Sequence, residues 1–332
     1  MQQTYDVVVF GLSNPDIVVY PPEGIKLTPR RITFVNRYMI RLGGPGSITA
    51  AALARLGLRT SFVGNIGKGV LGELIKRMLK EMNVDTRNAI EYPDELFTIV
   101  LVDEKGEGGT MIATLPMSPL FPSSSSIITH FKTISKAKIL FIAHWFWPYL
   151  RLFEIEDIPK CEVIRELKKM GYIIALDINY KAKDEPEEHD VYELACSLKY
   201  IDILLPNEFD AKIVGRRLFR TSSIESIVQG FLRLGPRIIG LKMGERGCYV
   251  VSQKSKCVIP AFVVKNIVDT AGAGDVFNAA FIYGWLKGWD IVSIGRFANA
   301  VAAYYITHPD PKKKFPTYYD VVKFLKYKQF NL

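Results

Sequence analysis

Short apolar runs rich in β-branched residues alternate along this chain with longer segments whose apolar residues recur at helical spacing. The runs predicted as strands are Tyr5–Phe10, Thr60–Asn65, Lys138–Ala143, Ile173–Asp177, Ile201–Leu205 and Arg237–Leu241. The segments predicted as helices are Gly46–Gly57, Val70–Met82, Cys161–Met170, Ser223–Leu234, Asp275–Lys287 and Ile291–Tyr305. Strands joined by helical crossovers form a mostly parallel sheet covered on both faces. We therefore predict a three-layer α/β fold with helices on both faces of a mostly parallel central sheet.

Two stretches interrupt this alternation. Residues 15–41 contain a strand-like run at Ile32–Ile40 and no helical pattern, and residues 97–115 indicate two strands around a glycine-rich turn. We predict that both stretches belong to a small antiparallel sheet, which forms a lid beside the main sheet. The serine-rich segment Pro116–Ser126 is predicted to be a loop. Because no linker or repeat divides the chain, we expect residues 1–332 to form a single domain.

The composition is that of a water-soluble globular protein, with 48% hydrophobic and 23% charged residues. No apolar run reaches the roughly 20 residues that span a bilayer, and the run Val7–Phe10 is too short for a signal peptide. We therefore expect a cytoplasmic protein with no membrane partner. The net charge of +9 is scattered along the sequence. This scatter favours an enzyme for anionic substrates and no nucleic-acid partner.

The four cysteines show no Cys-x-x-Cys spacing, and no metal-ligand cluster is visible among them and the histidines. We expect them to be buried thiols. Cys248 and Cys257 could also face each other across a hairpin that turns near Ser252, which leaves a disulfide between them as an alternative.

The most informative motif is Asp269–Asp275, which is followed directly by an apolar helix. Its small residues let the backbone approach a ligand closely, and the start of a helix offers free N–H groups and a positive dipole end. The motif therefore predicts a phosphate site. Asp275 would lie beside the bound anion and could accept a proton from a hydroxyl group. Alternatively, Asp275 only caps the helix and the glycines only turn the chain.

The segment Asp269–Asp275 resembles the C-terminal signature of the ribokinase/PfkB family of carbohydrate and nucleoside kinases. The other segments that resemble the family, in chain order, are Asn14 with Asp16, Gly43–Gly46 with the helix after it, Asp177–Lys181, Asn207–Asp210, Lys242–Gly247 and Asn299. These matches cover nearly the whole chain and keep the family's order. Together they are far more specific than any one of them.

The resemblance implies ATP and Mg²⁺ as cofactors, often with a monovalent cation such as K⁺. If the lid is an exposed sheet, pairing with a second copy would bury its edges, so we also expect a homodimer through the lid. Asp275 would act as the catalytic base, while the N–H groups of Gly272, Ala273 and Gly274 would stabilise the transferred phosphoryl group. The residues implied in substrate binding are Asn14, Asp16, Gly43, Gly44, Ser47 and Lys181. The residues implied in nucleotide binding are Asn207, Lys242, Gly244, Gly247 and Asn299, and those implied in metal binding are Asp210 and Asp269.

The sequence departs from the family pattern at several positions around the substrate and the metal. Ile48 stands where a sugar-binding Asn is usual, Asp210 replaces a Glu, and Lys181 replaces an Arg. Lys242 stands where Thr or Ser is common, and Gly69 stands where an Asp is often found. A hydroxyl group facing Ile48 would lose a partner, so we expect ribose and fructose to be poor substrates. A ligand with an apolar face or a ring would be preferred, and the segment from Trp145 to Trp147 could stack on it.

We predict an ATP-dependent kinase that acts on a hydroxyl, in particular a hydroxymethyl group, of a small sugar, sugar acid or polyol. The alternatives are a nucleoside kinase of the same family and a non-catalytic protein that keeps the fold and binds a ligand. A nicotinamide enzyme is a weaker alternative, because Gly67–Gly72 fits the Gly-x-Gly-x-x-Gly pattern but does not follow the first strand.

Overall fold

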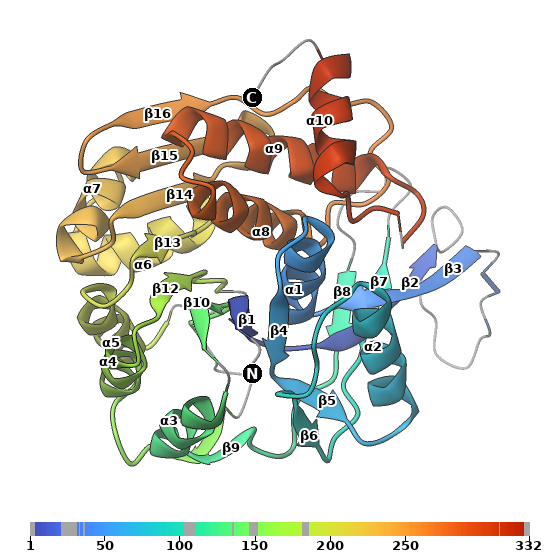
Figure 1. Cartoon of the computed structure of the whole chain (residues 1–332), viewed down its shortest axis with the longest axis horizontal. Coiled ribbons are helices and arrows are strands. Elements are labelled where there is room, and N and C mark those ends of the chain that lie inside the picture. The colour runs from blue at the N-terminus through green and yellow to red at the C-terminus, as the bar shows by residue number, and fades with distance from the viewer. Residues whose placement is uncertain are drawn as a thin grey trace.

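The computed structural model describes residues 4–20, 32, 34–35, 37–102, 110–134, 136–145, 152–180, 186–311 and 313–328. Its main sheet has eight strands (Figure 1). Their order is β16 (Lys256–Ile259), β15 (Cys248–Ser252), β14 (Ile238–Lys242), β13 (Ile203–Leu204), β12 (Ile173–Leu176), β10 (Ala137–Ile142), β1 (Tyr5–Phe10) and β4 (Thr60–Val63). Neighbouring strands are parallel from β14 to β4, and β15 and β16 are antiparallel.

Helices cover both faces of this sheet, as predicted. One layer contains α1 (Pro45–Arg55), α2 (Val70–Glu81), α8 (Ala273–Leu286), α9 (Ile291–Thr307) and α10 (Tyr318–Tyr327). The other contains α3 (Ser124–Thr133), α4 (Lys160–Lys169), α5 (Glu188–Leu198), α6 (Glu208–Phe219) and α7 (Ile224–Leu234). Because successive strand residues point to opposite faces, Val7 and Val9 enter the first core and Val8 enters the second. The predicted three-layer α/β fold is confirmed.

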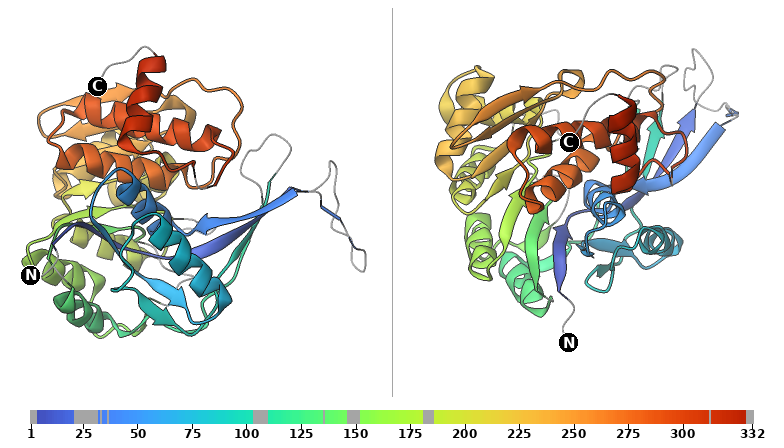
Figure 2. Two further views of the ribbon diagram at one scale, coloured as in Figure 1. Left: turned by 45° about the vertical axis from the view of Figure 1, so that its right-hand side comes forward. Right: turned by 45° about the horizontal axis from the view of Figure 1, so that its top comes forward.

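A separate four-stranded sheet, which we call the lid sheet, projects from one side of the molecule (Figure 2). Its order is β3 (Arg37–Gly43), β2 (Asn14–Tyr20), β7 (Thr98–Leu101) and β8 (Thr110–Ala113). The strands are antiparallel except for β2 and β7, which pair in parallel. The prediction of an antiparallel sheet is therefore wrong for this one pair, because β2 and β7 come from two distant stretches that run in the same direction.

Two short parallel pairs complete the described strands. They are β5 (Asn65–Gly67) with β6 (Ile90–Tyr92), and β9 (Phe121–Ser123) with β11 (Phe153–Ile155). The prediction of a loop over Pro116–Ser126 is wrong for its last three residues, because α3 begins at Ser124. Ser123 caps that helix by accepting a hydrogen bond from the Ser126 N–H, and the Ser126 side chain bonds back to the Ser123 backbone. A run of serines can thus start a helix because serine is a favourable N-cap residue.

The cysteine pairing differs from both expectations. Cys161 at the start of α4 and Cys196 in α5 form a disulfide, with their Cα atoms 5.7 Å apart. Cys248 and Cys257 are free thiols. The strand register places Cys257 opposite Val250 and Cys248 opposite Ile259, so the two cysteines are diagonal neighbours. Diagonal side chains are roughly 7–8 Å apart, which is too far for a disulfide.

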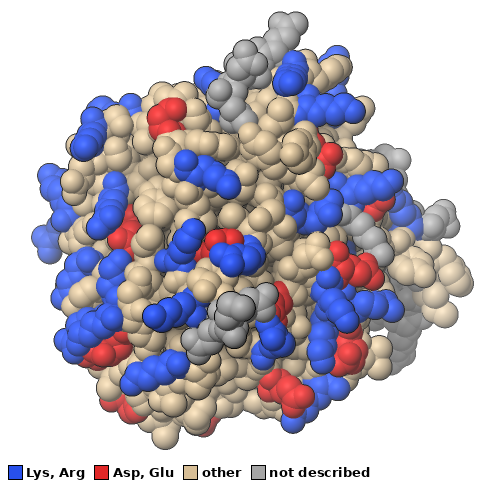
Figure 3. Space-filling model, viewed as in Figure 1, with Lys and Arg blue, Asp and Glu red and all other residues tan. Residues whose placement is uncertain are grey.

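The described part of the chain contains no helix that is both long enough and apolar enough to cross a membrane. On the face shown in Figure 3, basic side chains are spread over many elements and interspersed with acidic ones. No single basic patch stands out there, in line with the scattered charge of the sequence.

Candidate active site

The carboxyl ends of three neighbouring parallel strands carry the predicted site residues Asn207 and Lys242, together with Asp177, to which the sequence assigned no role. Asp177 follows β12, Asn207 follows β13, and Lys242 ends β14. Asn207 and Lys242 lie side by side in a bridge between the strand ends. In open α/β sheets, ligands bind at this edge. The fold thus brings together residues from three segments, of which the first and the last lie 65 positions apart in the sequence.

A buried hydrogen-bonded group, which we call the sheet-side network, joins Asp177, Lys242 and Asn278. The Lys242 Nζ donates to Asp177 Oδ2 at 2.6 Å and to Asn278 Oδ1 at 2.9 Å. The Asn278 Nδ2 donates to the same Asp177 oxygen at 2.6 Å. Asp177 Oδ1 is buried and accepts no hydrogen bond from the described residues. This oxygen points to a ligand, since buried acceptors are rarely left without a donor.

The segment before α8 forms the predicted anion site. Gly272 is the N-cap of α8 and has a φ of 88°, a conformation that glycine adopts without strain. A Cβ on Gly272 would also lie 2.7 Å from the hydroxyl of Tyr305. Of the three N–H groups predicted to bind the phosphoryl group, that of Ala273 already donates to Thr270 O. The N–H groups of Gly272 and Gly274 have no backbone acceptor among the described residues.

Asp275 lies in the first turn of α8, two residues after Ala273, and is half-buried. The N-cap position belongs to Gly272, and no side chain caps the helix there. The alternative in which Asp275 serves only as the helix cap is therefore wrong. The hydroxyl of Thr49 in α1 donates to the Asp275 carbonyl at 3.2 Å, which fixes this turn against α1.

A cavity of about 870 Å³ opens beside this turn. It is lined by Lys242, Gly244, Gly247, Gly274 and Asn299, which the sequence assigned to the nucleotide or phosphate site, together with apolar residues such as Phe262 and Ile306. Its size is in the range of cofactor sites. The Asn299 Nδ2 donates to Ile259 O and Pro260 O, so this amide also holds the end of β16.

The lid sheet carries the predicted substrate residues Asn14 and Asp16, both on β2. The Asn14 Nδ2 donates to Asp16 Oδ1 at 3.1 Å and to the Thr98 hydroxyl at 3.1 Å. A Cβ on Gly43 would come within 2.0 Å of Asp16 Oδ1, and one on Gly44 within 3.0 Å of Asn14 Oδ1. The two glycines are therefore required because the chain before α1 passes directly over this pair.

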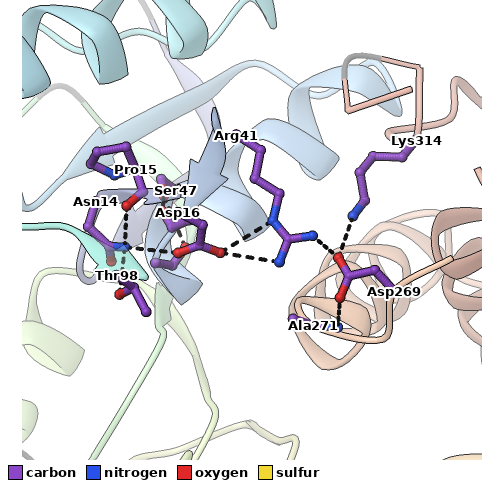
Figure 4. A network of polar contacts seen from close by, with 11 residues as sticks. Asn14, Pro15, Asp16, Arg41, Ser47, Thr98, Asp269, Ala271 and Lys314 are labelled. Atoms are coloured by element: carbon purple, nitrogen blue, oxygen red, sulfur yellow. Dashed lines mark hydrogen bonds and ion pairs between the residues drawn. The ribbon is translucent and has the colours of Figure 1, made fainter. Parts of the chain in front are cut away.

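Asp16 belongs to a second buried group, which we call the lid-side network and which Figure 4 shows. The Arg41 guanidinium donates to Asp16 Oδ2 at 3.4 Å and forms an ion pair with Asp269. The Lys314 Nζ lies 3.4 Å from Asp269 Oδ2. The Arg41, Asp269 and Lys314 side chains are at most 5% exposed. Two carboxylates are thus balanced by two basic side chains.

Burial, and after it the charge of Arg41, lowers the pKa of Lys314 to about 6, while Asp16 acts in the opposite direction. Burial likewise raises the pKa of Tyr305 above its usual range, and the negative charges of Asp275 and Asp16 act in the same direction. The Tyr305 ring contacts Lys314, and its hydroxyl lies next to Gly272, so this residue connects the lid-side network to the start of α8.

Arg41 and Lys314 were not predicted as site residues. Arg41 stands in a strand between Ile40 and Leu42, and Lys314 is one of three consecutive lysines. A charged residue inside an apolar strand just before two glycines is a weak signal that could have identified Arg41. Nothing distinguishes Lys314 from Lys312 and Lys313 in the sequence.

Several predicted residues differ in the structure from their expected role. Ser47 is fully buried, and its hydroxyl donates to the carbonyl groups of Gly43 and Gly44. It therefore fixes the turn before α1 and does not face a ligand. Ile48 is 5% exposed and packs in the first core beneath Gly272. Trp145 is buried in the second core, so it offers no stacking surface.

Lys181 and Trp147, which were also predicted to contact the ligand, lie outside the described residues. Asp210 is fully buried in the first turn of α6. Its backbone N–H and its Oδ2 both bond to the Asn207 side chain at 2.8 Å. Asn207 therefore caps α6 and positions Asp210 at the same time.

The glycine pattern Gly67–Gly72 does not form a dinucleotide site. The Glu95 carboxylate accepts a hydrogen bond from the Gly72 N–H at 3.2 Å, and a Cβ on Gly69 would lie 2.4 Å from Glu95 Oε1. An internal carboxylate thus fills the helix start at which a pyrophosphate would bind. The nicotinamide alternative is wrong for this reason.

Comparison with known proteins agrees with this geometry. The family model described as pfkB family carbohydrate kinase matches residues 5–317. This chain belongs to the pfkB family. The prediction of an ATP-dependent carbohydrate kinase is thereby confirmed at the level of the family.

Related proteins cover most of the chain. Ribokinase of Arabidopsis thaliana is 26% identical over 97% of this chain and 81% of its own length. The 2-dehydro-3-deoxygluconokinase of Bacillus subtilis is 25% identical over 88% of each protein. The solved structure of Arabidopsis thaliana ribokinase complexed with ribose and ATP has a TM-score of 0.73, with 24% identity over 98% of this chain and 99% of that one.

Proposed function

We propose that this pfkB-family kinase transfers the γ-phosphoryl group of ATP to a hydroxyl, in particular a hydroxymethyl group, of a small sugar, sugar acid or polyol. One observation carries the proposal: Ala273 and Gly274 at the start of α8 line a cavity of about 870 Å³, and the same helical turn carries Asp275 and the N–H groups of Gly272 and Gly274. A base and an anion site in the same helical turn are what an in-line transfer to a hydroxyl requires.

In this mechanism the Asp275 carboxylate accepts the proton of the substrate hydroxyl. The hydroxyl oxygen then bonds to the γ-phosphorus as the bond from that phosphorus to the bridging oxygen of ADP breaks. The N–H groups of Gly272 and Gly274 stabilise the charge on the transferred group, because they are already oriented and need not reorganise. The Lys242 Nζ faces the same turn, since a Cβ on Gly274 would lie 3.8 Å from it.

Residues at the carboxyl ends of β12 and β13 fit Mg²⁺. They supply hard oxygen ligands, and Asp177 Oδ1 is a buried oxygen without a hydrogen-bond donor among the described residues. Asp177, Asn207 and Asp210 are the residues that would hold the ion or its water molecules. When bound, the ion would neutralise charge on the ATP phosphates.

On the other side of the turn, we propose that Asn14 and Asp16 bind the hydroxyl groups of the sugar. The named activities of the relatives, ribokinase and 2-dehydro-3-deoxygluconokinase, support a sugar or a sugar acid. The preference for an apolar face or a ring loses the support of Trp145, which is buried in the second core, while Ile48 packs against Gly272. A nucleoside kinase stays the alternative within the family.

We also propose that two copies pair through the lid sheet. Tyr38, Ile40, Met111 and Ile112 are exposed apolar residues on its strands β3 and β8. Covering such a surface with a second copy would remove it from water. Sedimentation velocity should show a dimer that Ile112→Glu converts to a monomer; a wild-type monomer at all accessible concentrations would contradict the pairing.

The catalytic proposal is tested by Asp275→Asn. The amide cannot accept the proton, so kcat should fall by ~10²–10⁴ while the fold and ATP binding persist. The acceptor panel is ribose, fructose, 2-keto-3-deoxygluconate, inositol and common nucleosides, assayed with ATP and Mg²⁺. Glu188→Gln, the same chemical change in the first turn of α5, is the matched control and should leave kcat unchanged. An Asp275→Asn variant with more than about a tenth of wild-type kcat would show that Asp275 is not the base.

A further inference from the structure

The resemblance to the ribokinase family implies a monovalent cation near Asp269, and the residues around this carboxylate show whether one fits. Asp269 Oδ1 accepts a hydrogen bond from the Ala271 N–H at 2.9 Å. Asp269 Oδ2 is bonded to the Arg41 guanidinium and lies 3.4 Å from the Lys314 Nζ. Both oxygens of the carboxylate thus already have donors, and two of the three donors are basic side chains (Figure 4).

Lys314 lies directly behind the proposed anion site. Its Nζ is 3.8 Å from the centroid of the Tyr305 ring, over which it forms a cation–π contact. The hydroxyl of that ring lies 2.7 Å from where a Gly272 Cβ would be. The Lys314 side chain is 5% exposed, so the amine faces Asp269 and Tyr305 and not solvent.

Charge argues against an additional cation at this place. An ion bound to Asp269 would lie close to both Lys314 and Arg41, and like charges at such short range repel each other. Loss of a proton from Lys314 would not remove this repulsion, since Arg41 stays charged at every physiological pH. The residues present therefore do not fit K⁺ or another alkali ion.

We propose that Lys314, together with Arg41, takes the place of the monovalent cation, so that this kinase binds its nucleotide without K⁺. The two side chains hold the segment 269–272 from behind and thereby orient the N–H groups of Gly272 and Gly274 toward the phosphates. Lys314 is a positioning residue in this scheme, because it acts through Asp269 and Tyr305. The inference rests on the proposed placement of the ATP phosphates at the start of α8.

The first test uses the wild-type chain and needs no sugar substrate. ATP is supplied as its Tris salt with MgCl₂, and its Kd is measured by calorimetry in choline chloride, NaCl and KCl at equal ionic strength. The melting temperature without nucleotide is measured in the same salts. We expect the three Kd values to agree within a factor of two and the melting temperatures to coincide. A Kd that falls more than twofold in KCl relative to choline chloride would overturn the proposal.

The second test asks whether Lys314 is the internal cation. In choline chloride, Lys314→Ala should weaken ATP binding about tenfold, because a buried hydrogen-bond donor to Asp269 is lost. KCl or NH₄Cl should restore most of this loss, since the shortened side chain leaves room for an ion. Lys313→Ala is the matched control; Lys313 is exposed and pairs with Asp310, so the variant should behave as wild type.

Other outcomes of the second test count against the proposal. Wild-type affinity of Lys314→Ala in choline chloride would mean that Lys314 does not act on the phosphate site. Weakened binding that neither K⁺ nor NH₄⁺ restores would mean that Lys314 acts only through packing. If Lys314→Ala does not fold, the wild-type salt comparison decides alone. A chain that fails to bind ATP in any salt would refute the proposed function itself, which distinguishes the two failures.

Discussion

The two buried networks on either side of Asp269–Asp275 are built from different parts of the fold. The sheet-side network uses Asp177, Lys242 and Asn278, which lie at the ends of main-sheet strands and inside α8. The lid-side network joins two lid strands to the segment before α8 and to Lys314 near the C-terminus. The main sheet and α8 therefore position the sheet-side network. The lid-side network, in contrast, holds the lid sheet and the C-terminal segment to the anion site.

This comparison predicts that the lid-side network contributes more to stability. Asp269→Ala removes the shared acceptor of Arg41 and Lys314 and leaves both buried without it. The free energy of unfolding should fall by about 3–5 kcal/mol, as for other truncated buried ion pairs. Urea unfolding measures this change, and Asp269→Asn, which keeps an acceptor oxygen, should lose less. A loss below 1 kcal/mol for Asp269→Ala would contradict the role given to this network.

Both networks support the start of α8. A substitution there should weaken ligand binding without lowering the stability of the fold. Gly274 is exposed, and among the described residues a Cβ there would meet only Lys242, at 3.8 Å. Gly274→Val should therefore fold normally but weaken ATP binding and lower kcat, each by about tenfold or more, because its branches block the phosphates. Calorimetry and initial rates check this, with Gly274→Ala as an intermediate case. Unchanged constants in folded Gly274→Val would rule out the anion site.

The sheet-side network should act mainly on the nucleotide. Lys242→Thr introduces a residue type that is common at this position in the family and removes one charge-assisted hydrogen bond to Asp177. Asn278 still donates to the same oxygen, so stability should change by only about 1–2 kcal/mol. The KM for ATP should rise several-fold as the positive charge beside Gly274 is lost. A KM equal to that of wild type would exclude Lys242 from phosphate binding.

The exposed ion pair of Asp85 and Arg87 should contribute less to stability than either buried network. Hydrogen bonds from Arg87 lower the pKa of Asp85 to about 2, whereas an unfolded Asp titrates near pH ~3.9. Stability from this pair is therefore present above pH ~3.9 and is lost as the pH falls toward 2. Because Arg87 is 69% exposed, Asp85→Asn should cost under about 1 kcal/mol at pH 7 and nothing near pH 2. An equal loss at both pH values would contradict this titration.

Local sequence patterns were sufficient to predict most helices and strands of the main fold. The apolar run Tyr5–Phe10 is β1 at its full length, and Asp275 lies in the first turn of the helix that was predicted after the glycines. Patterns of this kind depend on neighbours in the chain. The resemblance to the family identified Asn207 and Lys242, and the parallel sheet brings them to one edge together with Asp177.

Contacts between distant segments could not be predicted in the same way. Lys314 lies 45 positions from Asp269 in the sequence and looks like its lysine neighbours. The disulfide joins Cys161 and Cys196 because α4 and α5 lie side by side, which no spacing rule indicates. Ile48 was predicted to face the substrate, but its side chain is 5% exposed and packs between the first core and Gly272. Such errors arise where burial depends on how two elements pack.

The most direct test of the account is to follow the phosphorus atom. Wild-type protein is incubated with ATP, Mg²⁺ and each member of the acceptor panel, and ³¹P NMR records the products. The account predicts a phosphomonoester signal, split by a neighbouring CH₂ group, that appears with one sugar, sugar acid or polyol in step with ADP and is absent with Asp275→Asn. Release of inorganic phosphate at the same rate with and without every acceptor, or no consumption of ATP at all, would contradict it.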